Sequence, residues 1–193
     1  MALVKGTNCG FVTEAPASDP EGSNSSCDNI SYGLKDTGPE NASRVTEIGW
    51  FCDNESEAAD FEVAIYDHNS GDNNPEDIVG SKSSDAKGTD SGWKKISGLN
   101  IPITPGETYW IAFSLANTST ATNKNYSSEA GEKFDLKGAT PELPDPWGVS
   151  DATYEELIGI YAVVEQEDSS ETNSASCLRK QSIQANGEVG LFA

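Results

Sequence analysis

Residues 107–115, with the sequence ETYWIAFSL, place Tyr109, Ile111 and Phe113 on one side of an extended chain and Trp110 and Ala112 on the other. Successive side chains of a β-strand point to opposite faces, so this spacing predicts a strand rather than a helix. Aromatic and β-branched residues also favour the pleated surface of a sheet. The stretch therefore predicts a β-strand with large apolar side chains on both faces.

Other stretches repeat the period of two. The faces predicted for residues 60–67, DFEVAIYD, are Phe61, Val63 and Ile65 against Glu62, Ala64 and Tyr66. Those predicted for residues 44–52, RVTEIGWFC, are Thr46, Ile48, Trp50 and Cys52 against Val45, Glu47 and Phe51. Residues 157–165, LIGIYAVVE, are apolar on both faces and predict a core strand. Weaker strand candidates are residues 11–13, 30–35, 78–81, 93–97, 99–103 and 133–136.

Clusters of Gly, Pro, Asn and Asp separate these stretches at the short spacing of antiparallel sheets, and no window carries a helical stripe. Residues 151–157, DATYEEL, predict one helical turn at most. The sequence predicts an all-β fold, a two-sheet antiparallel β-sandwich of jelly-roll-like type with extended polar N- and C-terminal segments. Residues 1–165 form the expected sandwich domain, including an N-terminal arm with a polar loop at 14–28. Residues 166–193 form the expected polar tail, an assembly contact.

The net charge of the chain limits the classes of partner that it can bind. Asp and Glu total 32 against 12 Lys and Arg, giving a formal net charge of -20. Such a charge excludes nucleic acid and anionic membranes as expected partners, because both require a basic surface. It also makes the folded chain repel itself, which bound cations or a salty medium would relieve.

The N-terminus lacks the apolar core and the cleavage site of a signal peptide, so we expect synthesis without a recognisable leader. Cys9, Cys27, Cys52 and Cys177 are too widely spaced for a zinc CxxC pair, and they allow three full disulfide pairings. Synthesis in the cytosol disfavours a disulfide. The alternation of residues 44–52 predicts a buried thiol at Cys52.

The sequence offers little catalytic chemistry. His68 is the single histidine, and it lies in the stretch YDHNSGDNN with no nucleophile elbow anywhere in the chain. A solvated loop histidine is the expectation for His68. Glycoside hydrolysis requires only two carboxylates across a cleft. In a chain with 32 acidic residues such pairs arise by chance, so they are no evidence for this activity. We therefore predict that the protein is not an enzyme.

The strongest candidate for a metal site is the loop DHNSGDNNPED, residues 67–77. Asp67, Asn69, Asp72 and Asn74 supply hard oxygen ligands at short spacing, which is the ligand type that calcium requires. The alternative is an Asx-rich hairpin turn in which the same side chains bond their own backbone. Calcium is accordingly the one cofactor that the sequence suggests.

Carbohydrate binding requires aromatic platforms beside polar groups, and three residues meet this description. Trp147 lies in LPDPWG, Trp93 opens a strand candidate after Gly92, and Tyr126 lies in the polar stretch NKNYSS. Alternation assigns Trp50 and Trp110 to the core instead. The alternatives for Trp147 are a hydrophobic lid over the end of the sandwich or a contact between subunits.

The order IGWFCD, FEVAIYD, NNPEDIVG, GWKKI and ITPGETYWIAFSL resembles a loose group of jelly-roll-like β-sandwich modules. Such modules occur in bacterial extracellular, carbohydrate-binding-like proteins and in phage-like environmental proteins. The opening MALVKGTNCGFVTEAP is similar to the start of uncharacterised proteins of the phage-like kind. The resemblance covers residues 44–115 and implies a sandwich used for attachment, for carbohydrate binding or at a virion surface.

These observations lead to an expected function without catalysis. We expect a virion surface component, a capsid decoration or tail-surface subunit, with copies of itself or other virion proteins as partners. The apolar residues at its two termini are the expected assembly contacts: Phe11, Val12, Leu191 and Phe192. The alternatives are a carbohydrate-binding module stabilised by calcium, with glycans as partners, or a subunit of an extracellular filament.

Overall fold

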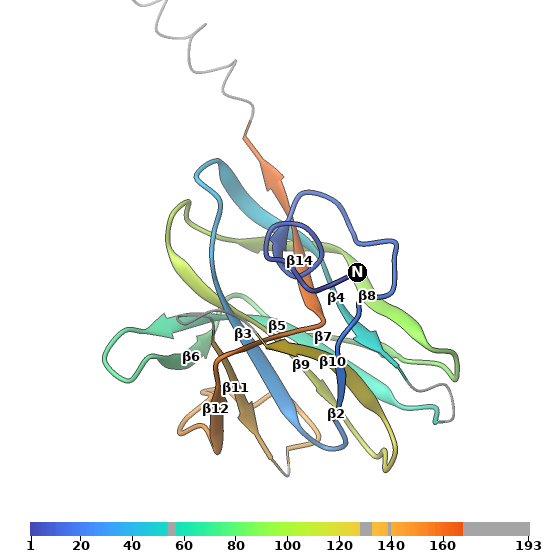
Figure 1. The fold of residues 1–193 in the computed structure, drawn as a ribbon. Coiled ribbons are helices and arrows are strands. Elements are labelled where there is room, and N and C mark those ends of the chain that lie inside the picture. The colour runs from blue at the N-terminus through green and yellow to red at the C-terminus, as the bar shows by residue number, and fades with distance from the viewer. Residues whose placement is uncertain (54–56, 128–132, 139, 168–193) are drawn as a thin grey trace, which may run out of the picture.

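The computed structural model describes residues 1–53, 57–127, 133–138 and 140–167. Every regular element in these ranges is a β-strand, and the strands run from β1 to β14 (Figure 1). The predicted all-β sandwich is confirmed. One layer is built around the strands predicted at 60–67 and 107–115, and the other around those predicted at 44–52 and 157–165.

The larger sheet has seven strands in the order β12-β11-β3-β9-β5-β6, and β7 also pairs with β5. All its pairs are antiparallel. β6 and β7 pair with opposite ends of β5. β6 pairs from Tyr66 onward, and β7 pairs up to Val63. The bounds are β3 Ser31–Thr37, β5 Asp60–Asn69, β6 Asn74–Ile78, β7 Ser83–Ala86, β9 Thr108–Leu115, β11 Phe134–Lys137 and β12 Ala152–Tyr154.

The second layer contains a four-stranded sheet in the order β1-β14-β4-β8. Its strands are β1 Gly10–Val12, β14 Ile160–Gln166, β4 Ala42–Cys52 and β8 Gly92–Pro102. β1 runs parallel to β14, whereas the other two pairs are antiparallel. An otherwise antiparallel sheet therefore has one parallel edge strand, which comes from the N-terminal arm.

A three-stranded sheet, β13-β10-β2, continues this layer beyond the end of β4. Its strands are β13 Glu156–Ile158, β10 Thr122–Ser127 and β2 Ser23–Ser26. The Phe51 N–H donates to the Gly159 carbonyl at 2.7 Å, and the Asp53 N–H donates to the Thr122 carbonyl at 2.9 Å. These two bonds join the end of β4 to the smaller sheet.

The main core lies between the two layers. The ring of Trp50 on β4 stacks on Phe113 of β9, with centroids 4.7 Å apart and planes 6° apart. Phe61 of β5 meets the same Trp50 ring edge-on at 5.9 Å. Burying one such side chain stabilises the fold by roughly 2–3 kcal/mol. The faces predicted for residues 60–67 and 107–115 are confirmed, because Phe61 and Phe113 belong to this core whereas Ala64 and Trp110 face the other way.

The faces predicted for residues 44–52 are wrong at one position. Val45 and Ile48 both lie in the main core, although strict alternation would place them on opposite faces. In the pairing of β4 with β14, Glu47 and Val45 lie opposite the consecutive residues Val163 and Val164, so β4 carries a β-bulge at Thr46. A bulge adds one residue to one strand and thereby moves the following side chains to the other face.

Several of the weaker predictions also differ from the structure. Residues 93–97 and 99–102 belong to one strand, β8, whereas residue 103 and residues 79–81 lie outside any strand. Residues 151–157 contain β12 and the start of β13 instead of a helical turn. The strand predicted at 157–165 is interrupted at Gly159, where a Cβ would lie 2.9 Å from the Asn123 Oδ1. A side chain does not fit this close approach, so the chain passes from β13 to β14 through a glycine.

Candidate functional site

The outer face of the seven-stranded sheet carries a second apolar cluster. Tyr66 of β5 and Trp110 of β9 project from this face and are fully buried. Residues 140–151, here called the capping loop, fold over the two rings with Leu143 and Trp147. Trp147 meets the Tyr66 ring edge-on, with centroids 5.2 Å apart. The loop thereby turns an outer sheet face into a small core.

Hydrogen bonds hold the capping loop in place. The Tyr66 hydroxyl donates to the Pro144 carbonyl at 2.5 Å, and the Leu143 N–H donates to the Glu62 Oε2 at 2.7 Å. The Trp147 indole N–H donates to the Ser150 hydroxyl at 3.0 Å, and this hydroxyl donates in turn to the Asp135 carboxylate at 2.8 Å. Buried polar groups require such partners, so the loop has a defined position on the sheet.

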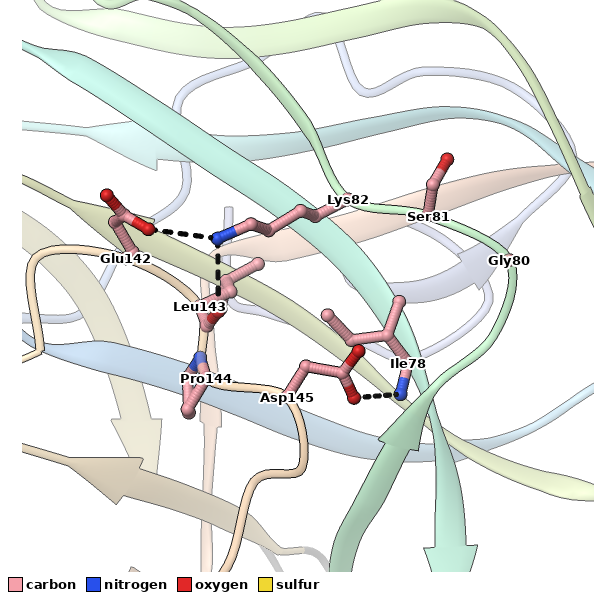
Figure 2. Close-up of a pocket in the computed structure, with 8 residues that line it drawn as sticks. All are labelled: Ile78, Gly80, Ser81, Lys82, Glu142, Leu143, Pro144 and Asp145. Atoms are coloured by element: carbon pink, nitrogen blue, oxygen red, sulfur yellow. Dashed lines mark hydrogen bonds and ion pairs between the residues drawn. The ribbon is translucent and has the colours of Figure 1, made fainter.

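A hollow of about 590 Å³ opens where the capping loop meets the β6–β7 link. We call it the Lys82 hollow; Figure 2 shows Lys82 reaching from the link toward Glu142 and Leu143 of the loop. In the same hollow, the Ile78 N–H donates to the Asp145 Oδ1 at 3.3 Å. The hollow is lined by Ile78, Gly80, Ser81, Lys82, Glu142, Leu143, Pro144 and Asp145.

The electrostatics of the Lys82 hollow favour neutral polar ligands over anions. Lys82 donates to Glu62 at 3.0 Å, to Glu142 at 3.3 Å and to the Leu143 carbonyl at 3.3 Å. Burial by itself lowers the pKa of Lys82, but the two carboxylates outweigh it and raise the pKa above its ordinary value. The ammonium group has three donors, and these three acceptors can occupy all of them. The Ser81 hydroxyl and the Glu142 and Asp145 carboxylates are then the groups available to a hydroxyl-bearing ligand.

His68 does not occupy a solvated loop, and that expectation is wrong. It lies on β5, half-buried, and its Nδ1 accepts a hydrogen bond from the Trp110 indole N–H at 3.1 Å. Burial lowers the pKa of His68, and the positive charges of Lys35 and Lys133 lower it further. An acceptor at Nδ1 requires the neutral ring with its hydrogen on Nε2.

Three of the four predicted calcium ligands are divided between two hollows, and Asn69 lines neither of them. Asp67 lines one of about 430 Å³ with His68 and Glu107, whereas Asp72 and Asn74 line another of about 310 Å³. Burial and then the charge of Asp77 raise the pKa of Asp67. Across the described ranges, no group of three or more His, Cys, Asp or Glu side chains could hold a metal ion.

Asn69 forms an Asx turn, which was the alternative to a calcium site. Its Oδ1 accepts from the Gly71 N–H at 2.9 Å and from the Asp72 N–H at 3.3 Å, which is an Asx turn. Asn74 donates to the Gly148 carbonyl at 3.3 Å and so ties the β5–β6 hairpin to the capping loop. Calcium at residues 67–74 stays a prediction.

The three predicted sugar platforms lie on three separate parts of the molecule. Trp147 is 0% exposed in the capping loop, so it forms a lid over the outer sheet face and presents no ring face to a ligand. Trp93 on β8 is half-buried, and its indole N–H donates to the Ser18 carbonyl at 3.1 Å. Tyr126 is 41% exposed, and it lies in β10 rather than in a loop.

The predicted assembly contacts at the N-terminus are part of the fold. Phe11 and Val12 are 3% and 2% exposed, because β1 pairs with β14. They are therefore not available to a neighbouring molecule, which corrects the expectation for both residues. Leu191 and Phe192 lie outside the described residues. Cys52 is a buried thiol as predicted, and so are Cys9 and Cys27, whereas Cys177 also lies outside the described residues.

The sequence missed most of the Lys82 hollow. Its two sides come from residues 78–82 and 142–145, which lie far apart in the chain and meet only because the capping loop crosses β5. The Pro-rich stretch ELPDPWG, residues 142–148, marked a turn but not the surface beneath it. No pattern of period two or 3.6 reports where a loop packs.

Comparison with models of protein families, with curated proteins and with solved structures found no match to this chain. Among the residues that the structure describes, no helix is long and apolar enough to cross a membrane. The class that the structure itself defines is the all-β sandwich.

Proposed function

We propose that the chain is a non-enzymatic structural or attachment subunit that assembles through its C-terminal residues. The observation that supports this is where the described strands end. Among the described residues the last strand, β14, ends at Gln166, and the Glu167 N–H donates to the Asn41 carbonyl at 2.8 Å. The sequence after residue 167 contains the apolar residues GLFA at 190–193. Such apolar residues suit a contact with another molecule.

The setting that we propose is a virion surface, as a capsid decoration or tail-surface subunit. The resemblance of the opening MALVKGTNCGFVTEAP to the start of phage-like proteins supports this setting over an extracellular filament. The net charge of -20 suits a subunit that stays soluble before it is assembled. Its partners on this proposal are copies of itself or other virion proteins.

Light scattering and negative-stain microscopy on the purified full-length protein test the proposal. We expect a defined oligomer, ring or filament from the full chain and a monomer from a chain that lacks residues 177–193. Near-ultraviolet circular dichroism checks that the Trp50–Phe113 stack survives the truncation. Oligomers of the same size from both chains would contradict assembly through the C-terminal residues.

Glycan binding is a second candidate, and the Lys82 hollow is the observation that favours it. Glu142 and Asp145 place two carboxylates beside the apolar side chains of Ile78 and Pro144, which suits the hydroxyl groups of a sugar. A glycan array on the full-length protein would test it, with Glu142→Gln as the site variant and Tyr126→Ala as the control. Specific binding that Glu142→Gln abolishes and Tyr126→Ala leaves intact would support this candidate; an array without binding would dismiss it.

A further inference from the structure

β8 is the outermost strand of the four-stranded sheet, with β4 as its neighbour on one side. It spans eleven residues, whereas each other strand at the edge of a sheet spans three to five. An outermost strand presents backbone N–H and carbonyl groups that another strand can pair with. β8 is therefore the longest of these edges, and its regular stretch Gly92–Ser97 precedes a register shift at residues 98–100.

The side chains of β8 leave part of the core rim open. Ile96 and Leu99 pack against the main core but are only half-buried, and so is Val79 of the β6–β7 link. Gly80 of this link lies against Ile101, where a Cβ would be 4.0 Å from the Ile101 side chain. The rim between β8 and the link is thus apolar and partly accessible. An added strand with apolar residues on one face would cover it.

The C-terminal sequence has the pattern that such a strand requires. In residues 183–193, IQANGEVGLFA, one face of an extended chain would carry Ile183, Ala185, Val189 and Leu191. Gln184, Asn186, Glu188 and Phe192 would lie on the opposite face. The alternation of apolar and polar residues over 183–189 is typical of a strand with one buried face.

Charge points to β8 as the acceptor, and length points to a neighbouring molecule. Residues 183–193 carry one charged side chain, Glu188, whereas β8 carries Lys94 and Lys95. The segment is therefore attracted to the β8 edge. β8 lies two strand positions from β14, roughly 10 Å away, whereas residues 168–182 can span about 50 Å when extended. A link this long suits a reach between molecules.

We infer that residues 183–193 of one molecule add as a strand to β8 of the next, with the apolar face of the segment over Ile96, Leu99 and Val79. The inference rests on the proposed function and names the acceptor surface for it. The repeated contact is head-to-tail, so it generates a ring if the rotation closes and a filament if it does not.

The experiment uses full-length chains. The donor variant is Ile183→Asp with Leu191→Asp, and the matched control is Gln184→Asp with Asn186→Asp, which adds the same charge to the other face. Light scattering gives the assembly state, and hydrogen exchange gives the protection of β8 amides. In the wild type and the control we expect assembly and β8 amides that exchange about ten-fold more slowly than in the donor variant. A synthetic peptide of residues 181–193, added in excess to the wild type, should dissolve the assembly and keep β8 protected.

Three results would overturn the inference in different ways. Assembly that the donor variant abolishes without any change in β8 exchange would place the acceptor elsewhere and leave the proposed function standing. A monomeric wild type whose β8 is protected only when Ile183 and Leu191 are intact would show that each chain fills its own edge. A monomeric wild type with equal β8 exchange in every variant would remove the proposed function together with the inference.

Discussion

Trp147 is the residue whose position decides between a lid and a sugar platform. Its ring is fully buried against Tyr66, and its N–H donates to Ser150. We predict that Trp147→Ala lowers the free energy of unfolding by about 4 kcal/mol, because it leaves a cavity under the capping loop. Trp147→Phe keeps most of the packing and removes the N–H donor, so it should cost only about 1–2 kcal/mol. Urea denaturation measures both losses. An unchanged stability for Trp147→Ala would show that the ring is not a lid.

Glu57 gives the fold a dependence on acid. Its carboxylate accepts from the Ser119 N–H at 2.8 Å, the Ser119 hydroxyl at 2.7 Å and the Thr120 N–H at 3.0 Å. These bonds, led by the Ser119 hydroxyl, lower the pKa of Glu57 from 4.5 to about 2. Because the folded pKa lies below the unfolded one, the stabilisation is complete above pH 4.5 and is lost as the pH falls toward 2.

Glu57→Gln should therefore reduce stability at neutral pH and lose this difference near pH 2. Urea denaturation across the acid range measures the two curves. Glu14→Gln, which removes the same charge from an exposed position, is the control, and we expect it to follow the wild type in shape. Parallel curves for Glu57→Gln and the wild type would contradict the role of these hydrogen bonds.

At the scale of single residues, the sequence shows which chemical groups are present but not which groups pack around them. It marked His68 and Trp147 as residues in polar, turn-rich stretches, and both are instead packed against aromatic rings of the outer sheet face. The burial of Trp147 depends on the capping loop crossing β5, which is a contact between residues about 80 positions apart, such as Tyr66 and Pro144. Side-chain type and spacing carry no record of such a crossing.

At the scale of elements, β1 depends on a single glycine. Gly10 has φ of 69°, and a Cβ there would collide with the Asp36 carboxylate that accepts the Phe11 N–H at 2.7 Å. We predict that Gly10→Ala costs about 2 kcal/mol or more, from left-handed strain plus the displaced carboxylate. Gly6 has φ of 74° with no atom within 4 Å of a Cβ, so Gly6→Ala should cost about 1 kcal/mol from strain alone.

The order of the two losses in urea denaturation checks this prediction, and exchange of the Phe11 amide reports on β1 directly. Faster Phe11 exchange is expected in Gly10→Ala and not in Gly6→Ala. Equal losses in both variants would mean that the Asp36 carboxylate moves without cost and does not anchor β1.

Elements were predictable where burial imposes a pattern. β5 and β9 are buried on both faces by different clusters, so their apolar residues alternate in a way that the sequence displays. β2, SNSS, and β7, SSDA, are short, polar edge strands, and no alternation of apolar residues announces them. Their pairing with β10 and β5 comes from backbone hydrogen bonds, which any residue except proline can make.

The whole molecule combines a closed sandwich with a large excess of negative charge. The arrangement of its layers could be predicted as a class, because period-two stretches separated by turns admit few other architectures. Strand order could not, since it depends on pairings such as β1 with β14, more than 140 residues apart, for instance Gly10 with Tyr161. The net charge of -20 acts on the whole molecule, because the repulsion among its acids destabilises every compact state of the chain.

Salts separate general screening from a specific calcium site. We predict that the free energy of unfolding in urea rises as NaCl increases from about 0.01 M to about 0.3 M, because screening weakens the repulsion among the acids. If residues 67–74 hold calcium, CaCl₂ raises the free energy of unfolding more than MgCl₂ does at equal ionic strength, and this extra rise saturates. Asp72→Ala should abolish that gain, whereas Asp90→Ala, which removes the same charge from another exposed loop, should retain it. Equal gains from both salts in all three chains would assign the whole effect to screening and leave Asn69 in its Asx turn as the full account of the loop.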